Sequence, residues 1–330
     1  MIITKTPYRI SFCGGGTDIP SFYKKFNGNV LATTINKHMH VLVKKQTGII
    51  EYKYKVHWSQ SEFKNKISDI NHPIVRETLK LLKIDYPIEI SSFADIPAST
   101  GLGSSSAFTV GLVKALYALS GRNTSKRQVA QIASKIEVNL LKRRIGRQDH
   151  YSTSYGNLNK IDFFKNGKIK INKIKIANKN RKILEDSIIL LYTNQKRNAD
   201  NVLKKQHNPT KNQIQNLNSM KLEVNKFIKI LKSRKIKFKY LGKLLNQQWF
   251  LKKKINSISN SKIDKMYNKT ISMGAYGGKL LGAGKGGFLL ILSNKKTQNK
   301  ITKFFGEKNI IKIKFENNGS QIIYKKKISI

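Results

Sequence analysis

The sequence contains little cysteine and no long apolar run. Cys13 is the only cysteine in 330 residues, so no intramolecular disulfide can form, which predicts a reducing compartment. The longest apolar runs, such as residues 288–292, are much shorter than a membrane span. Lys5 and Arg9 interrupt the apolar residues at the N-terminus, which lacks the continuous apolar region of a signal peptide. We therefore expect a soluble, cytoplasmic protein with no membrane partner.

Acidic residues are also scarce. The chain has 18 Asp and Glu against 64 Lys and Arg, a formal net charge of +46 at pH 7. Taken alone, this balance is typical of nucleic-acid-binding proteins. However, the basic residues are spread along the whole chain, without an aromatic-rich RNA-binding motif, zinc-ligand spacing or basic-region heptads. A solvated basic surface is the simpler interpretation, and an anionic substrate would explain part of the charge, because net charge governs association rather than chemistry.

Strand-like and helical patterns are mixed in both halves of the chain. In the first half, short apolar runs alternate with glycine-rich turns, and helical patterns cover residues 107–119 and 128–141. A lysine-rich stretch, 165–182, predicts strands and turns near a domain boundary. Beyond it come a buried strand at 187–193, three helical segments between 212 and 273, and closing strands at 288–293, 310–315 and 321–324. We predict an α+β protein with domains at residues 1–180 and 181–330.

The sharpest motif lies between a predicted strand and the helix that starts near residue 107. It reads Pro97-Ala-Ser-Thr-Gly101-Leu102-Gly103-Ser104-Ser105-Ser106. Two glycines allow a tight turn, and the backbone N–H groups at the start of a helix form an anion site. An ordinary turn with serine N-caps is the alternative, but two glycines and three serines exceed what capping needs. The segment therefore favours phosphate binding, although it is not a Walker A loop.

Two further glycine-rich segments flank this motif in the sequence. Residues 282–287 match G-x-G-x-x-G, but a strand follows them instead of a helix, which excludes a dinucleotide fingerprint. Near the N-terminus, Gly14, Gly15, Gly16 and Thr17 precede Asp18, whose carboxylate could accept hydrogen bonds from sugar hydroxyls. The alternative is that Asp18 is the N-cap of a helix over 19–25, and this segment alone does not decide between the two.

Because acids are rare, Glu137 and Asp149 are conspicuous. Glu137 lies on the second helical pattern, and Asp149 lies just past its end in Gly146-Arg-Gln-Asp149-His. A kinase needs one carboxylate for Mg²⁺ and another near the attacking hydroxyl. On spacing alone, the simpler interpretation is that both are surface acids paired with lysines.

The order of the three glycine-rich motifs resembles that of the GHMP kinases, which include galactokinase, homoserine kinase, mevalonate kinase and phosphomevalonate kinase. Within them, the likeness is to the D-glycero-D-manno-heptose 7-phosphate kinase branch and extends over roughly residues 2–293. The segments that carry it are Thr6-Pro-Tyr-Arg-Ile-Ser-Phe-Cys-Gly-Gly-Gly-Thr-Asp18, His72-Pro-Ile-Val-Arg-Glu77, Gly146-Arg-Gln-Asp149, Trp249-Phe-Leu-Lys-Lys253 and Gly277-Gly-Lys-Leu-Leu-Gly-Ala-Gly284.

The resemblance implies a two-domain fold, with an N-terminal domain like domain 2 of ribosomal protein S5 and a ferredoxin-like C-terminal domain. It also implies the phosphate and metal sites between them. Pro97 and residues 101–106 would bind ATP, and Ser105 and Glu137 would hold Mg²⁺, since a hydroxyl and a carboxylate suit a hard cation. Asp149 would accept or orient the proton of the attacking hydroxyl, and Arg9 would stabilise both this aspartate and the transferred phosphoryl group.

The resemblance further implies an acceptor site. Gly15, Gly16, Thr17 and Asp18 would bind the sugar, and Gly284 would support substrate from the other domain. Arg197 is a candidate for a distal phosphate, with a solvated surface charge as the alternative.

Two residues depart from the family pattern. Cys13 replaces an apolar residue and is expected to be a small buried hydrophobe. Lys285 replaces a glycine, which would lower the free energy of unfolding by about 1 kcal/mol if that position needs a positive φ. Alternatively, the Lys285 ammonium contacts a phosphate.

From these features we predict a kinase that uses ATP and Mg²⁺ to phosphorylate the anomeric hydroxyl of D-glycero-D-manno-heptose 7-phosphate. The product would be the 1,7-bisphosphate, for nucleotide-activated heptose. The alternatives are another GHMP sugar-1-kinase, acting on fucose or a hexose, and a nucleic-acid-binding protein on a kinase fold. No specific nucleic acid is expected as a partner, and the sequence leaves open whether the chain forms a homodimer.

Overall fold

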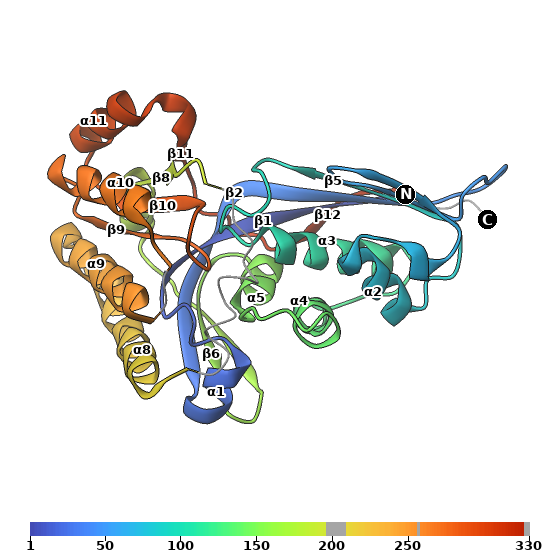
Figure 1. Cartoon of the computed structure of the whole chain (residues 1–330), viewed down its shortest axis with the longest axis horizontal. Coiled ribbons are helices and arrows are strands. Elements are labelled where there is room, and N and C mark those ends of the chain that lie inside the picture. The colour runs from blue at the N-terminus through green and yellow to red at the C-terminus, as the bar shows by residue number, and fades with distance from the viewer. Residues whose placement is uncertain (196–208, 256–257, 327–330) are drawn as a thin grey trace.

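The computed structural model describes residues 1–195, 209–255 and 258–326. In this part of the chain, one large sheet and one smaller sheet are each covered by helices (Figure 1). Both halves of the chain contribute strands and helices, and the predicted α+β class is confirmed.

The large sheet has eight strands. Its order is β12 (Gln321–Lys325), β1 (Ile2–Cys13), β2 (Gly28–Lys45), β5 (Ile88–Ala94), β3 (Tyr54–His57) and β4 (Ser61–Lys64). The long strand β2 pairs with β5 along its second half and with β6 (Leu158–Phe163) along its first, and β7 (Ile169–Lys173) pairs with β6. Only the β3–β5 pairing is parallel in the described sheet.

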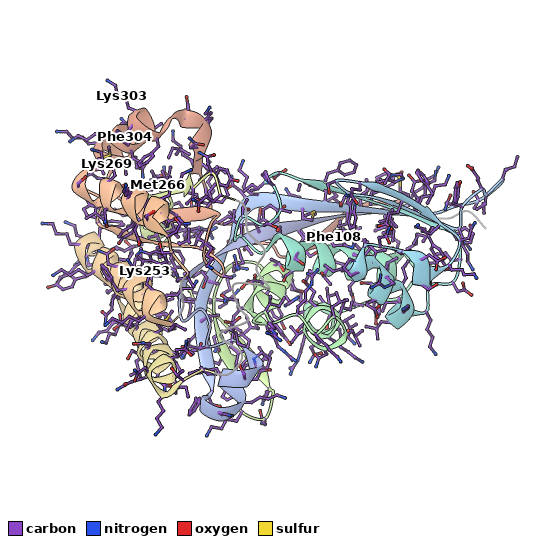
Figure 2. The ribbon with its side chains drawn as sticks, viewed as in Figure 1. Phe108, Lys253, Met266, Lys269, Lys303 and Phe304 are labelled. Carbon is purple, nitrogen blue, oxygen red and sulfur yellow. The ribbon has the colours of Figure 1, made fainter. Side chains whose placement is uncertain are left out.

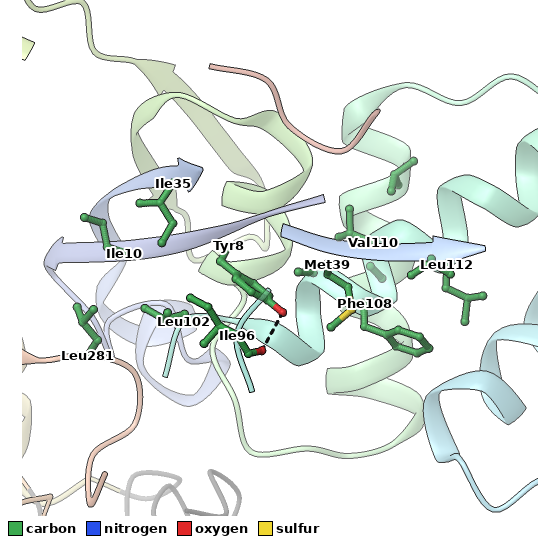
Figure 3. Packing of buried hydrophobic residues seen from close by; sticks show 14 of the residues in the cluster. Tyr8, Ile10, Ile35, Met39, Ile96, Leu102, Phe108, Val110, Leu112 and Leu281 are labelled. Carbon is green, nitrogen blue, oxygen red and sulfur yellow. Dashed lines mark hydrogen bonds between the residues drawn. The ribbon is translucent and has the colours of Figure 1, made fainter. Parts of the chain in front are cut away.

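Four helices lie along one face of this sheet: α2 (Pro73–Leu82), α3 (Ser104–Leu119), α4 (Lys126–Ser134) and α5 (Gln148–Tyr155) (Figure 1). The central helix α3 packs its apolar side chains, such as Val110 and Leu112, against those of the β1–β2 pair (Figure 3). The buried Tyr8 side chain lies in this core, and its hydroxyl donates to the carbonyl of Ile96 over 3.4 Å. This packing fixes the start of α3 beside the middle of β1.

The structure differs from the helix predicted over 128–141 in the second half of that segment. The α-helix α4 ends at Ser134, and a π-helical turn, Lys135–Leu140, follows. A π-turn carries more residues per turn than an α-helix, and such turns often occur at functional sites. Here the turn contains Glu137, which is fully buried.

The second sheet has the order β11 (Ile310–Lys312), β8 (Ile188–Tyr192), β10 (Phe288–Leu292) and β9 (Gly277–Leu280), all antiparallel. Its helices include α9 (Phe238–Ile255), α10 (Ser261–Ser272) and α11 (Lys295–Phe305), and α8 (Lys211–Lys232) packs on α9. The three helical segments predicted between 212 and 273 and the strand predicted at 187–193 are thus confirmed. Of the predicted strands and turns over 165–182, β7 and the turn before it are present, but the last five residues belong to helix α6 (Asn178–Asp186).

The end of the described chain returns to the first sheet. Strand β12 pairs with the beginning of β1, and an isolated bridge joins Ile35 to Phe315. The first sheet therefore contains strands from both ends of the chain, and the boundary between residues 180 and 181 stays a prediction.

Short helices complete the framework. Among the described residues they are α1 (Pro20–Phe26) and two 3₁₀ turns, Ile67–Asp69 and Glu307–Asn309. No helix in the described ranges is both long and apolar enough to cross a bilayer. Lysines are distributed over the outer helices, where Lys253, Lys269 and Lys303 lie on α9, α10 and α11 (Figure 2).

Candidate active site

A cavity of about 1180 Å³ lies where the start of α3 faces α9 and β9. Its wall contains the glycine-rich segment near residue 16, the segment 97–106, Lys279 of β9, and Gly282 and Ala283 of the turn that follows β9. The three glycine-rich motifs, which are far apart in the sequence, therefore meet at one cavity.

The loop over 97–106 does not use its serines as caps. Helix α3 begins at Ser104, earlier than the predicted residue 107, and its N-cap is Gly103, which has a φ of 80° and no side-chain capping bond. A Cβ at Gly103 would lie 3.3 Å from an Asp149 carboxylate oxygen, so glycine allows both this conformation and the close approach. Ser105 Oγ and Ser106 Oγ contact Glu137 and His150 instead, and a helix start without a side-chain cap is a suitable site for an anion.

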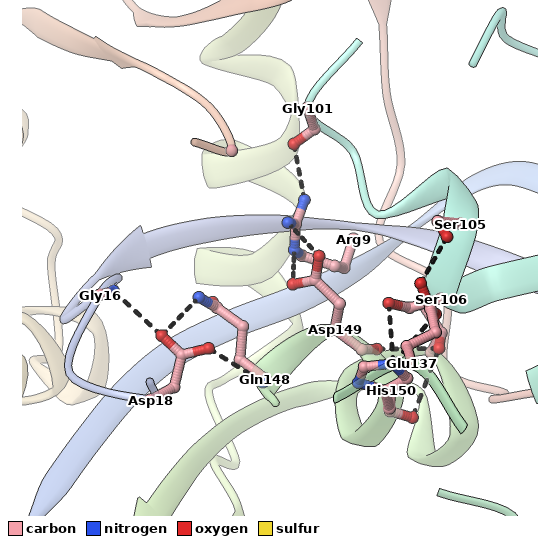
Figure 4. A network of polar contacts seen from close by, with 12 residues as sticks. Arg9, Gly16, Asp18, Gly101, Ser105, Ser106, Glu137, Gln148, Asp149 and His150 are labelled. Carbon is pink, nitrogen blue, oxygen red and sulfur yellow. Dashed lines mark hydrogen bonds and ion pairs between the residues drawn. The ribbon is translucent and has the colours of Figure 1, made fainter. Parts of the chain in front are cut away.

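The buried Glu137 carboxylate is the centre of a hydrogen-bond network (Figure 4). Its Oε2 accepts from Ser105 Oγ at 2.5 Å and from Arg143 Nη1 at 2.7 Å. Its Oε1 accepts from Thr109 Oγ1 at 2.9 Å and lies 3.0 Å from His150 Nε2. Burial would raise the pKa of Glu137, but His150, Arg143 and Ser105 outweigh it and lower that pKa to about 2.

Asp149 and Arg9 form a bidentate ion pair in the middle of the cavity wall. Arg9 Nε and Nη2 each donate to one carboxylate oxygen of Asp149 over 2.6 Å. The remaining Nη1 donates to the carbonyl of Gly101 over 2.7 Å. One guanidinium therefore fixes the orientation of Asp149 and ties it to the loop that precedes α3 (Figure 4).

Asp18 is 1% exposed and does not cap helix α1, whose N-cap is Ile19. Its carboxylate accepts from the backbone N–H of Gly16 at 3.0 Å and from Gln148 N and Nε2, both at 3.1 Å. Burial raises the pKa of Asp18, and the neighbouring charge of Asp149 acts in the same direction, against the backbone hydrogen bonds. Asp18 and Asp149 thus lie on adjoining parts of the wall, and the capping interpretation of Asp18 is wrong.

The third glycine-rich segment supports the loop before α3 from behind. Phe288 N donates to the carbonyl of Thr100 over 3.2 Å, and a Cβ at Gly287 would lie 2.1 Å from that same oxygen. Lys285 has a φ of 60°, is exposed and is not among the residues that line the cavity. The structure therefore favours the first interpretation of Lys285, a lysine at a position with left-handed backbone, over a phosphate contact.

Most of the residues singled out from the sequence reach the cavity wall. Those that do are Arg9, Gly15, Gly16, Asp18, Pro97, Gly101, Gly103, Ser104, Ser105, Ser106, Glu137 and Asp149. Three others do not line the cavity: Thr17, Leu102 and Gly284. The Thr17 hydroxyl donates hydrogen bonds to the carbonyls of Gly14 and Asn29, and the Leu102 side chain is buried. A Cβ at Gly284 would collide with Ile258. Arg197 lies outside the described residues. The expected burial of Cys13 is confirmed.

Several wall residues were not predicted. Trp58, His72 and Phe108 form an aromatic cluster, with ring centroids 3.9 Å and 5.0 Å apart in succession. Burial lowers the pKa of His72 to about 3, and Arg143 acts in the same direction, so the ring is neutral. Arg143 and Gln148 were also missed, although Gln148 directly precedes Asp149 in the sequence.

Comparisons with known proteins agree with this geometry. The model of the GHMP kinases N terminal domain matches residues 73–157, and the GHMP kinases C terminal model matches residues 229–311. The chain is 30% identical over 313 residues to D-glycero-alpha-D-manno-heptose 7-phosphate kinase of Campylobacter jejuni, covering 92% of each protein. It is also 30% identical over 240 residues to mevalonate kinase of Methanocaldococcus jannaschii, covering 72% of each.

Among solved structures, a D-glycero-D-manno-heptose 1-phosphate kinase from Bacteroides thetaiotaomicron superposes with a TM-score of 0.74. The match covers 99% of this chain and 100% of that one at 19% identity, which establishes a common two-domain fold. Together with the family matches and the converging motifs, these likenesses show that the chain belongs to the GHMP kinases and is a sugar kinase that transfers a phosphoryl group from ATP to an alcohol group.

Proposed function

We propose that this enzyme phosphorylates the anomeric hydroxyl of D-glycero-D-manno-heptose 7-phosphate to give the 1,7-bisphosphate. The observation that carries the substrate assignment is the 30% identity to a heptose 7-phosphate kinase, which extends over 92% of both chains. The arrangement of Asp18 beside the Arg9–Asp149 pair supports it, because a buried carboxylate next to a catalytic carboxylate suits a polyhydroxylated acceptor.

The cavity has two parts on either side of the Arg9–Asp149 pair. Ser105 and Glu137 lie on one side, and Asp18 and Gln148 on the other (Figure 4). We assign the first side to ATP, with its phosphates on the N–H groups at the start of α3 and its base near the neutral aromatic cluster of Trp58, His72 and Phe108. We assign the second side to the acceptor sugar.

We propose that Asp149 accepts or orients the proton of the attacking hydroxyl. Its two oxygens are held by Arg9, so the carboxylate has a fixed direction relative to the loop over residues 101–106. The Arg9 guanidinium also provides positive charge where charge develops on the transferred phosphoryl group. Positioning and electrostatics then account for the catalysis, since phosphoryl transfer needs little covalent chemistry from the protein.

The Ser105–Glu137 pair fits a Mg²⁺ ion bound with the nucleotide. Both residues offer oxygen, which Mg²⁺ prefers, and the ion is usually held by one or two protein ligands together with substrate phosphates and waters. The described residues contain no group of three or more His, Cys, Asp or Glu side chains that could hold a metal alone, which agrees with a shared site. The ion would neutralise charge on the phosphates, and Arg143 beside Glu137 adds to that neutralisation.

Replacing Glu137 with glutamine is expected to flatten the dependence of ATP affinity on Mg²⁺ concentration, because the neutral amide is a poorer ligand for a hard cation. Nucleotide titrations at several Mg²⁺ concentrations measure this. The matched control is Glu185→Gln, since Glu185 also pairs with an arginine, Arg181, but lies outside the cavity. Superimposable titrations for Glu137→Gln and the parent would exclude Glu137 as a ligand.

The substrate assignment is tested by assaying ATP consumption with D-glycero-D-manno-heptose 7-phosphate, the same heptose without phosphate, fucose and hexoses. We expect kcat/KM for the heptose 7-phosphate to exceed that for the unphosphorylated heptose by at least about tenfold. Binding energy from the remote phosphate would help to position the reacting hydroxyl. Equal efficiency, or a preference for a neutral sugar, would instead favour another sugar-1-kinase of the family.

A further inference from the structure

Two lysines from the second half of the chain line the cavity. Lys252 on α9 and Lys279 on β9 are 7% and 2% exposed, and both lie in the wall with Gly282 and Ala283. Lysine is rarely buried to this extent without a compensating partner, because removing an ammonium group from water is unfavourable. Lys252 and Lys279 therefore differ from the solvated lysines on the outer helices, because they are buried and line a cavity.

The contacts of Lys279 do not neutralise its charge. Its Nζ donates to the carbonyl of Phe12 over 3.1 Å, and no carboxylate of the described residues lies within ion-pair distance of it. Burial, and to a lesser degree the positive charge of Arg9, lowers the pKa of Lys279 to about 8, although the Cys13 thiol acts in the opposite direction. Lys252 Nζ donates to the carbonyl of Gly282.

Lys279 is close to the part of the cavity assigned to the acceptor. Its hydrogen-bond partner Phe12 directly follows Ser11, which lines the cavity. Ser11 also lies near Gly15, because a Cβ added to Gly15 would be 3.7 Å from Ser11 Oγ. Ser11 is 6% exposed, and its Oγ has no hydrogen-bond partner among the described residues. The buried Oε1 of Gln148 also lacks one. These unpaired polar atoms are a second, independent indication that a polar ligand occupies this side.

The other cations of the wall are already engaged. Arg9 pairs with Asp149, and Arg143 pairs with Glu137. An acceptor that carries a phosphate brings about two negative charges next to ATP, and basic groups must offset this repulsion. Among the described residues, Lys279 has no carboxylate partner and lies in the cavity wall, so it is placed to do so.

We propose that Lys279 binds the phosphate of a sugar phosphate acceptor. This inference rests on the proposed function and names the residue that would distinguish a phosphorylated acceptor from a neutral sugar. Lys279 would act on substrate binding and not on the transfer itself, because Asp149 and Arg9 occupy the reacting centre.

The test is Lys279→Met, which keeps most of the apolar stem and removes the charge. We expect KM for the phosphorylated sugar to rise by about tenfold or more, the usual effect of losing a hydrogen bond to a charged group. KM for ATP and kcat/KM for the unphosphorylated sugar should change less than about twofold. Lys279→Arg, which keeps the charge, should retain much of the preference for phosphorylated sugars.

The matched control is Lys253→Met, because Lys253 neighbours Lys252 on α9 but pairs with Asp264 outside the cavity. Lys253→Met should leave the preference for phosphorylated sugars unchanged. If Lys279→Met does not fold, as judged by its unfolding midpoint, Lys279→Gln carries the same expectation, because its amide is neutral but is still a donor for the carbonyl of Phe12. The proposal is overturned if the folded Lys279 variant keeps the preference for phosphorylated sugars. It is also overturned if KM rises for ATP alone.

The panel of acceptors separates this inference from the proposed function. If the parent enzyme prefers a different phosphorylated sugar and Lys279→Met loses that preference, the heptose assignment is wrong and the inference stands. If the parent prefers heptose 7-phosphate and Lys279→Met keeps that preference, only the inference is wrong. A parent enzyme that prefers neutral sugars contradicts both.

Discussion

Replacing Asp149 with asparagine is expected to leave ATP binding intact and to lower turnover by about 10²- to 10⁴-fold, the usual contribution of a positioned proton acceptor. Asparagine has nearly the same shape, but its amide is a very weak proton acceptor. Its NH₂ group would also face an N–H of Arg9, where the carboxylate oxygen now accepts. The loss should therefore fall on kcat, with both substrates saturating, while nucleotide affinity stays close to that of the parent.

The matched control for this variant is Asp162→Asn. Asp162 lies on β6, outside the cavity, and is also hydrogen-bonded and paired, with Asn172 and Lys160. Its side chain is 18% exposed, against 21% for Asp149, so both substitutions act on carboxylates of similar burial. Turnover of Asp149→Asn within a few fold of the parent would exclude Asp149 as the group that handles the proton.

Many residues of the cavity wall could be singled out from the sequence because they lie in continuous motifs. The loop over 97–106 combines glycines, serines and a helix start, and Arg9, Glu137 and Asp149 occupy recognisable positions in the family pattern. The roles proposed for them depend on the resemblance, however, since on spacing alone a rare acid in a lysine-rich chain is more simply explained as a surface ion pair.

The local conformation around Glu137 could not be predicted. Apolar residues recur with helical spacing through residues 128–141, and this pattern does not reveal the change from an α-helix to a π-turn at residue 135. The partners of Glu137 are also separated in sequence: Ser105 and Thr109 come from α3, and His150 comes from α5. Only the packing of these helices on the sheet brings them together.

The environments of Asp18 and of the two cavity lysines could not be predicted from the sequence, for different reasons. An aspartate just before a helix has the same local pattern whether it caps that helix or binds Gln148, 130 residues away. Lys252 and Lys279 lie in segments that carry the family resemblance, but in a chain with 64 Lys and Arg nothing in those segments shows that either lysine is buried. Their burial, which separates them from the surface lysines, is a property of the fold alone.

Gly146 offers a specific way to disturb the proposed acceptor site through Asp18. A Cβ at this position would lie 1.8 Å from Asp18 Oδ2 and 2.3 Å from Asp18 Cγ, much closer than two such atoms can approach. Gly146→Ala should therefore displace the Asp18 carboxylate from the N–H groups of Gly16 and Gln148 that now hold it. We expect kcat/KM for the sugar to fall by roughly 10²-fold, the effect of about 1 Å of misplacement in a positioned site.

A double-mutant cycle distinguishes this mechanism from a general loss of structure. Asp18→Ala removes the carboxylate that the new methyl group would meet, so it leaves space for alanine at position 146. If Gly146→Ala acts through Asp18, adding it to Asp18→Ala should lower kcat/KM by no more than a few fold. Independent effects would instead multiply, because substitutions that do not share a partner are additive in free energy. ATP affinity, measured without sugar, should match that of the parent in all three variants. Asp18 lies on the side of the Arg9–Asp149 pair assigned to the acceptor (Figure 4), and a Cβ at Gly146 would meet Asp18 first.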